Sequence, residues 1–162
     1  MTEPQQQQPV FVIEKIYVKD LSLEIPHAPK IFLEREAPEI NLQLANSDSV
    51  IEGEIHEVVV TATVTARLKE KDKVMFLVEA HQAGIFRIQN VPGNEVEPVL
   101  NVLCPNILFP YLRETISDTV TRAGFPPVIL NPVNFEAIYH QKKQQAAAGS
   151  QSDQSANNTT RH

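Results

Sequence analysis

The chain has 162 residues, of which 42% are hydrophobic and 21% charged, a balance typical of one folded domain rather than a disordered chain. It has no apolar run long enough to span a membrane, no secretory signal at its N-terminus and a single cysteine, so we expect a soluble intracellular protein without an internal disulfide. The net charge is −6; residues 141–162 carry three basic and one acidic residue (+2), which leaves −8 on residues 1–140. This acidic body argues against nucleic acid as a partner and favours a basic one.

Residues 10–25 predict a first strand whose N-terminal part is apolar on both faces. Strict alternation places Val10, Val12, Ile16 and Val18 on one face, and Phe11, Ile13 and Tyr17 on the other. Two interpretations remain open for this part: the sheet is covered by its own helices, or the strand forms a subunit interface. Further along, Leu21, Leu23 and Ile25 alternate with Asp20, Ser22 and Glu24.

Three further strands follow. After a proline-rich loop with exposed Ile31, Phe32 and Leu33, residues 39–45 predict the second strand and residues 46–49 a turn. Residues 54–68 and 74–88 predict two strands joined by a charged hairpin loop. The inward-facing residues of this pair are Val58, Val60, Ala62, Val64, Ala66 and Leu68, then Phe76, Val78, Ala80, Phe86 and Ile88. Short connections indicate an antiparallel sheet.

The second half of the chain predicts helices. A first helix follows Pro92 and Gly93, with prolines 105 and 110 interrupting the pattern. Residues 112–120 resume a helical stripe that ends at Gly124, and Asn131 before Pro132 is the predicted cap of a last helix. Four strands followed by helices predict the α+β class.

Two surface features stand out. Asp20 and Glu24 on the first strand, and Leu77 and Glu79 on the fourth, point away from the predicted core; if these strands are neighbours, carboxylates flank an exposed leucine. This face is either ordinary solvated surface or a docking site. Apolar residues also gather in the irregular segments 31–33 and 126–130, which either fold back on the core or form the edge of an apolar groove.

No catalytic constellation emerges from the chain. The five histidines show no metal-ligand spacing, the glycines form no phosphate-binding loop, and Cys104 sits among apolar residues as an inert buried thiol would. We therefore expect neither an enzyme nor a cofactor.

Five segments resemble the SecB family of bacterial protein-export chaperones. They are IYVKDLSLEIPHAPKIF at 16–32, HEVVVTATVTARL at 56–68, AGIFRI at 83–88, CPNILFPYLRETI at 104–116 and FPPVILNPVNFEAIY at 125–139. CPNILFPY and NPVNF are the most specific, and the resemblance runs from about residue 10 to 145. It implies a four-stranded antiparallel sheet packed against two C-terminal helices, assembled as a homotetramer that is a dimer of dimers.

The resemblance also implies a function. Members of the family are ATP-independent holdases that keep precursor proteins unfolded in the cytoplasm and pass them to the motor ATPase SecA. The positions matching the SecA contact are Asp20, Glu24, Leu77 and Glu79. The positions matching the client-binding groove are Ile31, Phe32, Ile40, Leu42, Leu44, Val128 and Ile129. The expected organisation is a disordered arm at 1–9, a chaperone domain at 10–148 and a disordered tail at 149–162.

Three positions depart from the family pattern. Glu36 stands where a tryptophan is common, which removes one aromatic client contact; Ala83 replaces a glycine, and Leu112 a smaller residue. Two rival functions remain at this stage. One is a SecB-like chaperone dedicated to a single antitoxin partner, and the other is a ligand-binding or enzymatic oligomer, for which the sequence offers no convergent polar groups.

Overall fold

The computed structural model describes residues 4–156, which fall into two compact units, the first ending at Asn131 and the second beginning at Pro132. The elements, in chain order, are β1 (Val10–Glu24), the 3₁₀ turn η1 (Lys30–Leu33), β2 (Glu39–Glu52), β3 (Ile55–Leu68), β4 (Lys73–Gln89), α1 (Gly93–Pro98), the π-helical segment η2 (Val99–Leu103), α2 (Cys104–Arg122) and α3 (Phe135–Ala156).

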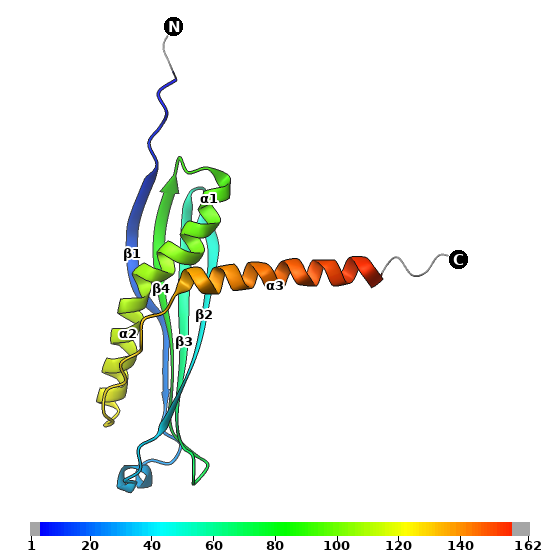
Figure 1. Cartoon of the computed structure of the whole chain (residues 1–162). Coiled ribbons are helices and arrows are strands. Elements are labelled where there is room, and N and C mark those ends of the chain that lie inside the picture. Colours follow the sequence, from blue (N-terminus) through cyan, green and yellow to red (C-terminus); the bar gives the residue numbers. More distant parts are fainter. Residues whose placement is uncertain (1–3, 157–162) are drawn as a thin grey trace. The chain divides into compact units, whose positions relative to one another are not determined.

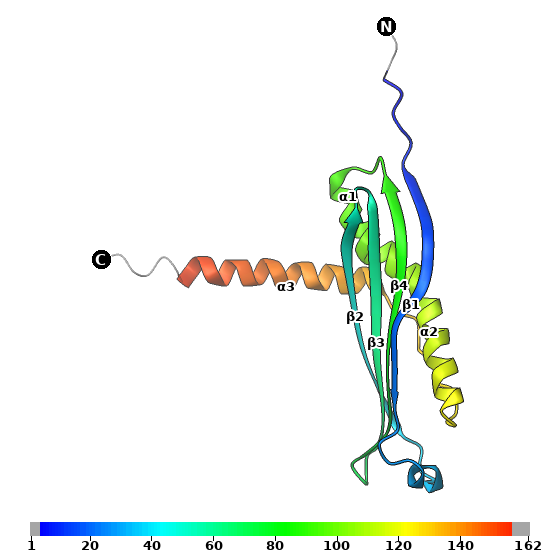
Figure 2. The same ribbon diagram turned by 180° about the vertical axis from the view of Figure 1, so that it is seen from behind.

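The four strands form one antiparallel sheet in the order β1-β4-β3-β2, which confirms the predicted fold class. Helix α2 packs against β3 and β4 on one face of this sheet (Figure 1). We call this the helix face and the opposite one the outer face; Figure 2 shows the sheet from behind, with the strands in front of α2. The first and last positions in the sheet belong to β1 and β2, so each has one unpaired edge.

The core lies between the helix face and α2. The predicted inward residues of β3 are all fully buried, and those of β4 are at most 5% exposed. On α2, Leu112, Ile116 and Val120 form the predicted stripe and are fully buried against the sheet. The β-branched threonines that alternate with the inward residues of β3 suit the outer face, because they fit a pleated surface and tolerate water.

Strand β1 carries two β-bulges that the sequence pattern did not predict. Its pairing with β4 skips Glu14 and Lys19, and each extra residue reverses which side chains face the helix. Phe11 and Ile13 pair with core residues of β4, and Ile16 and Val18 join them on the same helix face after the first bulge. The predicted division of these apolar residues between two faces was therefore wrong.

Three boundaries also differ from the predictions. Strand β2 runs on to Glu52, because residues 46–49 pair with β3 instead of turning, and the turn occurs at Gly53, whose φ is +51°. Ile31 is only 2% exposed, since η1 turns it inward, whereas Phe32 and Leu33 are exposed as predicted. Pro110 lies inside α2 without ending it.

The last helix begins later than predicted. Asn134, not Asn131, caps α3: its side-chain oxygen accepts a hydrogen bond from the backbone N–H of Ala137 at 3.0 Å. The helix continues through Gly149 to Ala156. Residues 1–3 of the predicted arm and 157–162 of the predicted tail lie outside the described residues, and the division of the chain at residues 9 and 149 stays a prediction.

Candidate functional site

The first candidate site is an acidic patch on the outer face, formed by Asp20, Glu24, Leu77 and Glu79. Strands β1 and β4 are neighbours, as the predicted patch requires, and Glu24 lies directly opposite Leu77. Asp20 and Glu24 are exposed, while Leu77 and Glu79 are half-buried between strands. Glu24 and Glu79 thus flank Leu77, and Asp20 lies further along the same face opposite His81, an arrangement suited to a partner with basic and apolar groups.

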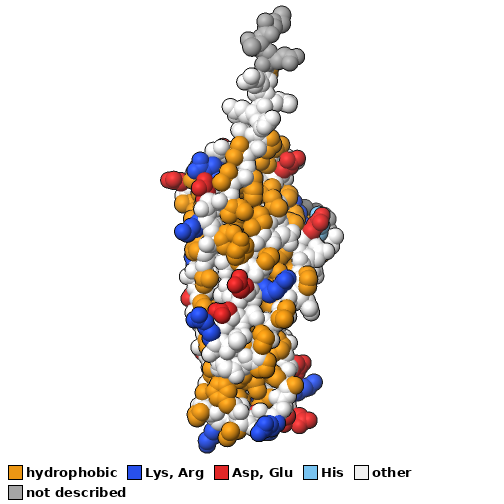
Figure 3. Space-filling model, turned by 90° about the vertical axis from the view of Figure 1, so that its left-hand side faces the viewer, with side chains coloured by type: hydrophobic (Ala, Val, Ile, Leu, Met, Phe, Trp, Pro, Cys, Tyr) orange, Lys and Arg blue, Asp and Glu red, His pale blue; other side chains and the backbone are white. Residues whose placement is uncertain are grey.

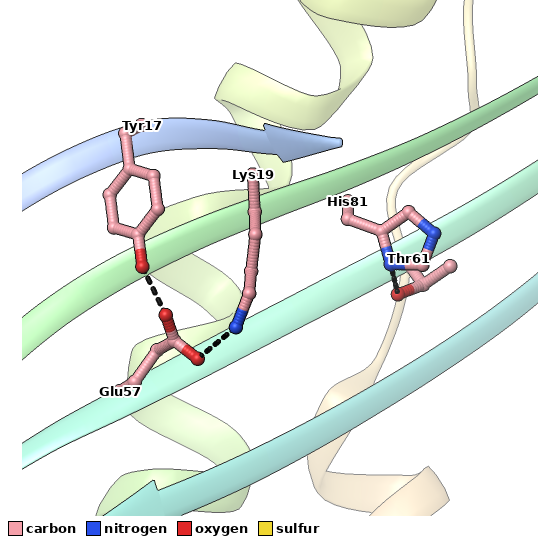
Figure 4. Close-up of polar contacts among 5 residues, drawn as sticks. All are labelled: Tyr17, Lys19, Glu57, Thr61 and His81. Carbon is pink, nitrogen blue, oxygen red and sulfur yellow. Dashed lines mark hydrogen bonds and ion pairs between the residues drawn. The ribbon is translucent and has the colours of Figure 1, made fainter. Parts of the chain in front are cut away.

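His81 links this acidic patch to the neighbouring strand β3. It lies opposite Asp20 in the ladder, and its Nε2 is 2.8 Å from Glu79 Oε1. Its Nδ1 is 3.0 Å from Thr61 Oγ1 (Figure 4). The carboxylate can only accept, so Nε2 carries a proton and donates to Glu79, while the Thr61 hydroxyl donates to Nδ1 in the neutral ring. The first contact holds the Glu79 carboxylate beside the His81 ring, and the second orients the ring. The contact with Thr61 was not predictable, because residues 61 and 81 are far apart in the chain.

A second polar cluster lies beside the acidic patch. The Glu57 carboxylate accepts hydrogen bonds from the Tyr17 hydroxyl and from the Lys19 ammonium, the latter at 2.6 Å (Figure 4). Burial, together with the nearby Glu57 carboxylate, raises the pKa of Tyr17 to about 12, and the bonds from Lys19 and Tyr17 lower the pKa of Glu57. Lys19 is thereby paired with Glu57 rather than with the carboxylates of the acidic patch.

The second candidate site is an apolar groove of about 540 Å³ beside η1. Its aromatic side is a stack in which the Phe125 ring lies 5.0 Å from that of Phe32 and 4.9 Å from that of Phe76. Gly124 permits this packing: its φ is +93°, and a β-carbon there would lie 3.1 Å from the Phe32 ring. The groove is lined by Ile31, Phe32, Glu34, Arg35, Glu36, Ala37, Pro38, Ile40, Met75, Phe76, Gly124, Phe125, Pro126, Pro127 and Val128.

Charged residues line one side of the groove. Lys71 is paired with Glu34 and lies 3.8 Å from Glu36, the residue that replaces the family's tryptophan. The hydrogen bond from Lys71 holds the pKa of the Glu34 carboxyl below its ordinary value, and the same bond raises the pKa of Lys71. Both groups are therefore charged near neutral pH, so the groove is apolar on its aromatic side and polar along this one.

The structure brings together four of the seven predicted client-binding residues. Ile31, Phe32, Ile40 and Val128 line the groove. Leu42 and Leu44 are paired with the core residues Val64 and Ala62, so they lie on the helix face like Ile40. They extend the groove along β2. Ile129 lies elsewhere, in a separate depression along α2, and is 76% exposed. Sequence reasoning missed Phe125, although its position between Gly124 and two prolines marks an aromatic residue held in a rigid connector.

A further apolar surface runs along β1. Phe11, Ile13, Val18, Leu21 and Leu23 all point to the helix face of this edge strand and are 37–46% exposed. Figure 3 views the molecule from the side that carries β1 and shows hydrophobic side chains along much of it. Coverage of the first strand by the chain's own helices is therefore incomplete, and this apolar strip along β1 is left partly open to solvent.

The remaining chemistry is limited. Within the described residues, no group of three His, Cys, Asp or Glu side chains is placed to hold a metal ion. Cys104 is fully buried, and burial raises the pKa of its thiol to about 12, as expected of an inert cysteine. In the part of the chain that the structure describes, none of the helices has both the length and the apolar character needed to cross a membrane.

Comparison with known proteins decides the family. The family model described as preprotein translocase subunit SecB matches residues 4–146. The chain belongs to the SecB family. It is 88% identical to the protein-export protein SecB of Nitrosomonas eutropha and 86% identical to that of Nitrosomonas europaea, each over 162 residues and 100% of both chains.

A solved structure supports the SecB fold. A SecB-like chaperone of Mycobacterium tuberculosis, in complex with a peptide from the HigA1 antitoxin, superposes with a TM-score of 0.63 over 76% of this chain and 91% of its own. At 16% identity this likeness concerns the fold alone. The predicted resemblance to SecB is thus confirmed, and the acidic patch and the apolar groove are candidate sites of a SecB protein.

Proposed function

We propose that this chain is an ATP-independent chaperone that keeps precursor proteins unfolded in the cytoplasm and delivers them to SecA for export. Membership of the SecB family supports this function. The structural observation that carries it is the separation of two surfaces: an open apolar groove reached from the helix face, and the acidic patch on the outer face. A client and a partner ATPase can then be bound at the same time.

The groove is the proposed client site. An unfolded precursor exposes apolar side chains that aggregate unless they are covered. The proposed contacts in and along the groove are Ile31, Phe32, Ile40, Leu42, Leu44 and Val128, to which Phe125 is added through its stack with Phe32. Ile129, in the separate depression along α2, is proposed as an outlying client contact. Without ATP, such a holder acts only by mass action, because it binds the unfolded state and competes with folding.

The acidic patch is the proposed SecA site, with Asp20, Glu24 and Glu79 contributing charge and Leu77 an apolar contact. The excess of acidic residues on the chain favours encounter with a basic segment of the partner. Because the patch lies on the face opposite α2, SecA can reach it while a client occupies the groove.

The proposed assembly is a homotetramer built as a dimer of dimers. The unpaired edge of β1 and its exposed apolar side chains support a contact between copies at this strand. Several grooves on one tetramer would hold different segments of one long client, which gives avidity without strong sequence demands. We propose the chaperone domain as residues 10–148, with tails at 1–9 and 149–162.

The test is the refolding of a slow-folding exported precursor without ATP. A stoichiometric amount of tetramer is expected to arrest refolding, and SecA with ATP is expected to release the client. Refolding at an unchanged rate would contradict the function. The rival role, a chaperone dedicated to one antitoxin, is not favoured, because the relatives matched over the full chain are named protein-export proteins; it predicts tight binding of one client and no arrest of others.

A further inference from the structure

The acidic patch depends on a single extra residue in β1. Val18 lies opposite Gln82 on the helix face, so strict alternation would place Asp20 and Glu24 on the helix face as well. Because Lys19 is skipped in the pairing, Asp20 instead lies opposite His81, and Glu24 opposite Leu77, on the outer face. The bulge at Lys19 therefore decides on which side of the sheet the two carboxylates are presented.

Burial does little to fix this arrangement. In the observed register Leu21 and Leu23 point to the helix face, yet they remain 43% and 38% exposed. A slip of one residue beyond Val18 would turn both leucines outward and both carboxylates inward, and the long segment before β2 has room to absorb it. Register is weakly specified where neither face of a strand is buried, so another interaction must select it.

Polar groups hold the bulge from both faces of the sheet. On the outer face, Glu57 binds the side chains of Tyr17 and Lys19, the residues on either side of Val18 (Figure 4). On the helix face, Gln82 donates from Nε2 to the Tyr17 carbonyl at 3.2 Å, and its Oε1 accepts from the Thr115 hydroxyl of α2 at 3.1 Å. Gln82 is only 3% exposed, and a buried amide is costly to leave unpaired.

We propose that Glu57 and Gln82 are positioning residues for SecA docking: they hold the bulge at Lys19 and so keep Asp20 and Glu24 on the outer face beside Leu77 and Glu79. This inference rests on the proposed role of the acidic patch. Neither positioning residue contacts SecA in this scheme. They affect docking only by setting which side chains of β1 point to the outer face.

The first test measures the Kd for SecA and the arrest of precursor refolding in Glu57→Ala and Gln82→Leu. Each substitution is expected to weaken SecA docking about tenfold and to leave refolding arrest unchanged. Glu14→Ala is the matched control, because it also removes a carboxylate paired with a cation, here Arg87 at 2.9 Å, but away from the bulge at Lys19. It is expected to leave docking unchanged. A loss of docking equal to that of Glu57→Ala would overturn the proposal.

The second test is a rescue. Deleting Lys19 removes the extra residue, so Val18 and Asp20 become neighbours in a regular ladder and keep their partners Gln82 and His81. The deletion is therefore expected to restore docking in the Glu57→Ala background to within about threefold of wild type. The control is the double variant Glu57→Ala, Lys19→Ala, which lacks the same two side chains but keeps the extra residue in β1. Its SecA docking should stay as weak as that of Glu57→Ala. Failure of the deletion to rescue docking would show that Glu57 acts by another route.

A structural readout accompanies both tests. Methyl NMR of the wild-type and rescued proteins should show contacts of Leu21 with Ala80, its partner on the helix face, and Glu57→Ala should lose them. Loss of docking with these contacts intact would refute the positioning role. Failure of the proposed function would look different. Wild-type protein that does not bind SecA at all would contradict the role of the acidic patch, whatever the variants do.

Discussion

Replacing Phe32 by alanine tests the groove most sharply. The ring stacks on Phe125 on one side and remains 46% exposed on the other, so it presents a preformed apolar surface to a client. The substitution removes that surface and one aromatic contact, but it leaves the buried part of the core in place. We expect weaker client binding together with a measurable loss of folding stability, because the buried part of the ring is removed as well.

The magnitude follows from the exposed area. A phenylalanine side chain offers roughly 200 Å² of apolar surface, of which the free part is about 90 Å². At about 25 cal/mol per Å² this corresponds to about 2 kcal/mol for each occupied groove, or about a 30-fold change in affinity. The remaining part, about 110 Å², is already buried in the folded protein, and at the same coefficient its loss should reduce the free energy of unfolding by about 3 kcal/mol, so binding is compared under conditions where the variant is still folded.

The assay is the concentration of this protein at which the refolding of an exported precursor is half-arrested. The matched control is Leu33→Ala, in the same 3₁₀ turn: Leu33 is 79% exposed but does not line the groove. We expect Phe32→Ala to need a much higher concentration and Leu33→Ala to behave like wild type. Equal effects of the two substitutions would refute the assignment of the groove.

Three further predictions concern the folded body. Leu112→Ala should lower the free energy of unfolding in urea by about 2–5 kcal/mol, because the fully buried side chain leaves a cavity under the sheet; a loss well below 1 kcal/mol would contradict the packing of α2. Cys104 should react with a thiol reagent at pH 8 only at the rate of unfolding, since it is buried with its pKa raised to about 12, and rapid labelling of native protein would refute this. The folded pKa of Tyr17, about 12, exceeds its ordinary value of 10.0, so the stability that Tyr17 contributes is complete below pH 10 and is lost as the pH rises towards 12. An ultraviolet titration of the tyrosines should show a phenol that ionises near pH 12 and is absent from Tyr17→Phe. Persistence of that ionisation in the variant would contradict its assignment to Tyr17.

The parts of the fold that follow a simple period were predictable from the sequence. Every residue that alternation predicted as inward on β3 and β4 is buried, because the two strands alternate over most of their length and one face is buried, although the buried Gln82 on the same face was not predicted. The stripe of Leu112, Ile116 and Val120 was equally clear. The acidic patch was predictable for the same reason, since Asp20 and Glu24 follow the last bulge and alternate regularly from there.

The errors arose where tertiary contacts override local pattern. The bulges appear in the sequence only as three-residue steps, from Ile13 to Ile16 and from Val18 to Leu21. Apolar residues on the opposite face obscure these steps, so the faces of residues 10–18 were assigned wrongly. Residues 46–49 have turn-like composition, but pairing with β3 keeps them in a strand. The groove was only partly predictable, because Phe125 reaches it through a stack with rings from two distant segments.

The salt dependence of two affinities, for SecA and for a precursor, tests most directly whether an acidic patch and an apolar groove perform these two separate tasks. SecA binding and precursor binding should be titrated on the same protein between about 0.02 and 0.3 M salt, a range over which the Debye length falls several-fold. Docking through the acidic patch is expected to weaken at least about tenfold over this range, while client binding in the apolar groove is expected to change by less than about twofold. Equal salt sensitivity of the two interactions would contradict the assignment of the two tasks to two different surfaces.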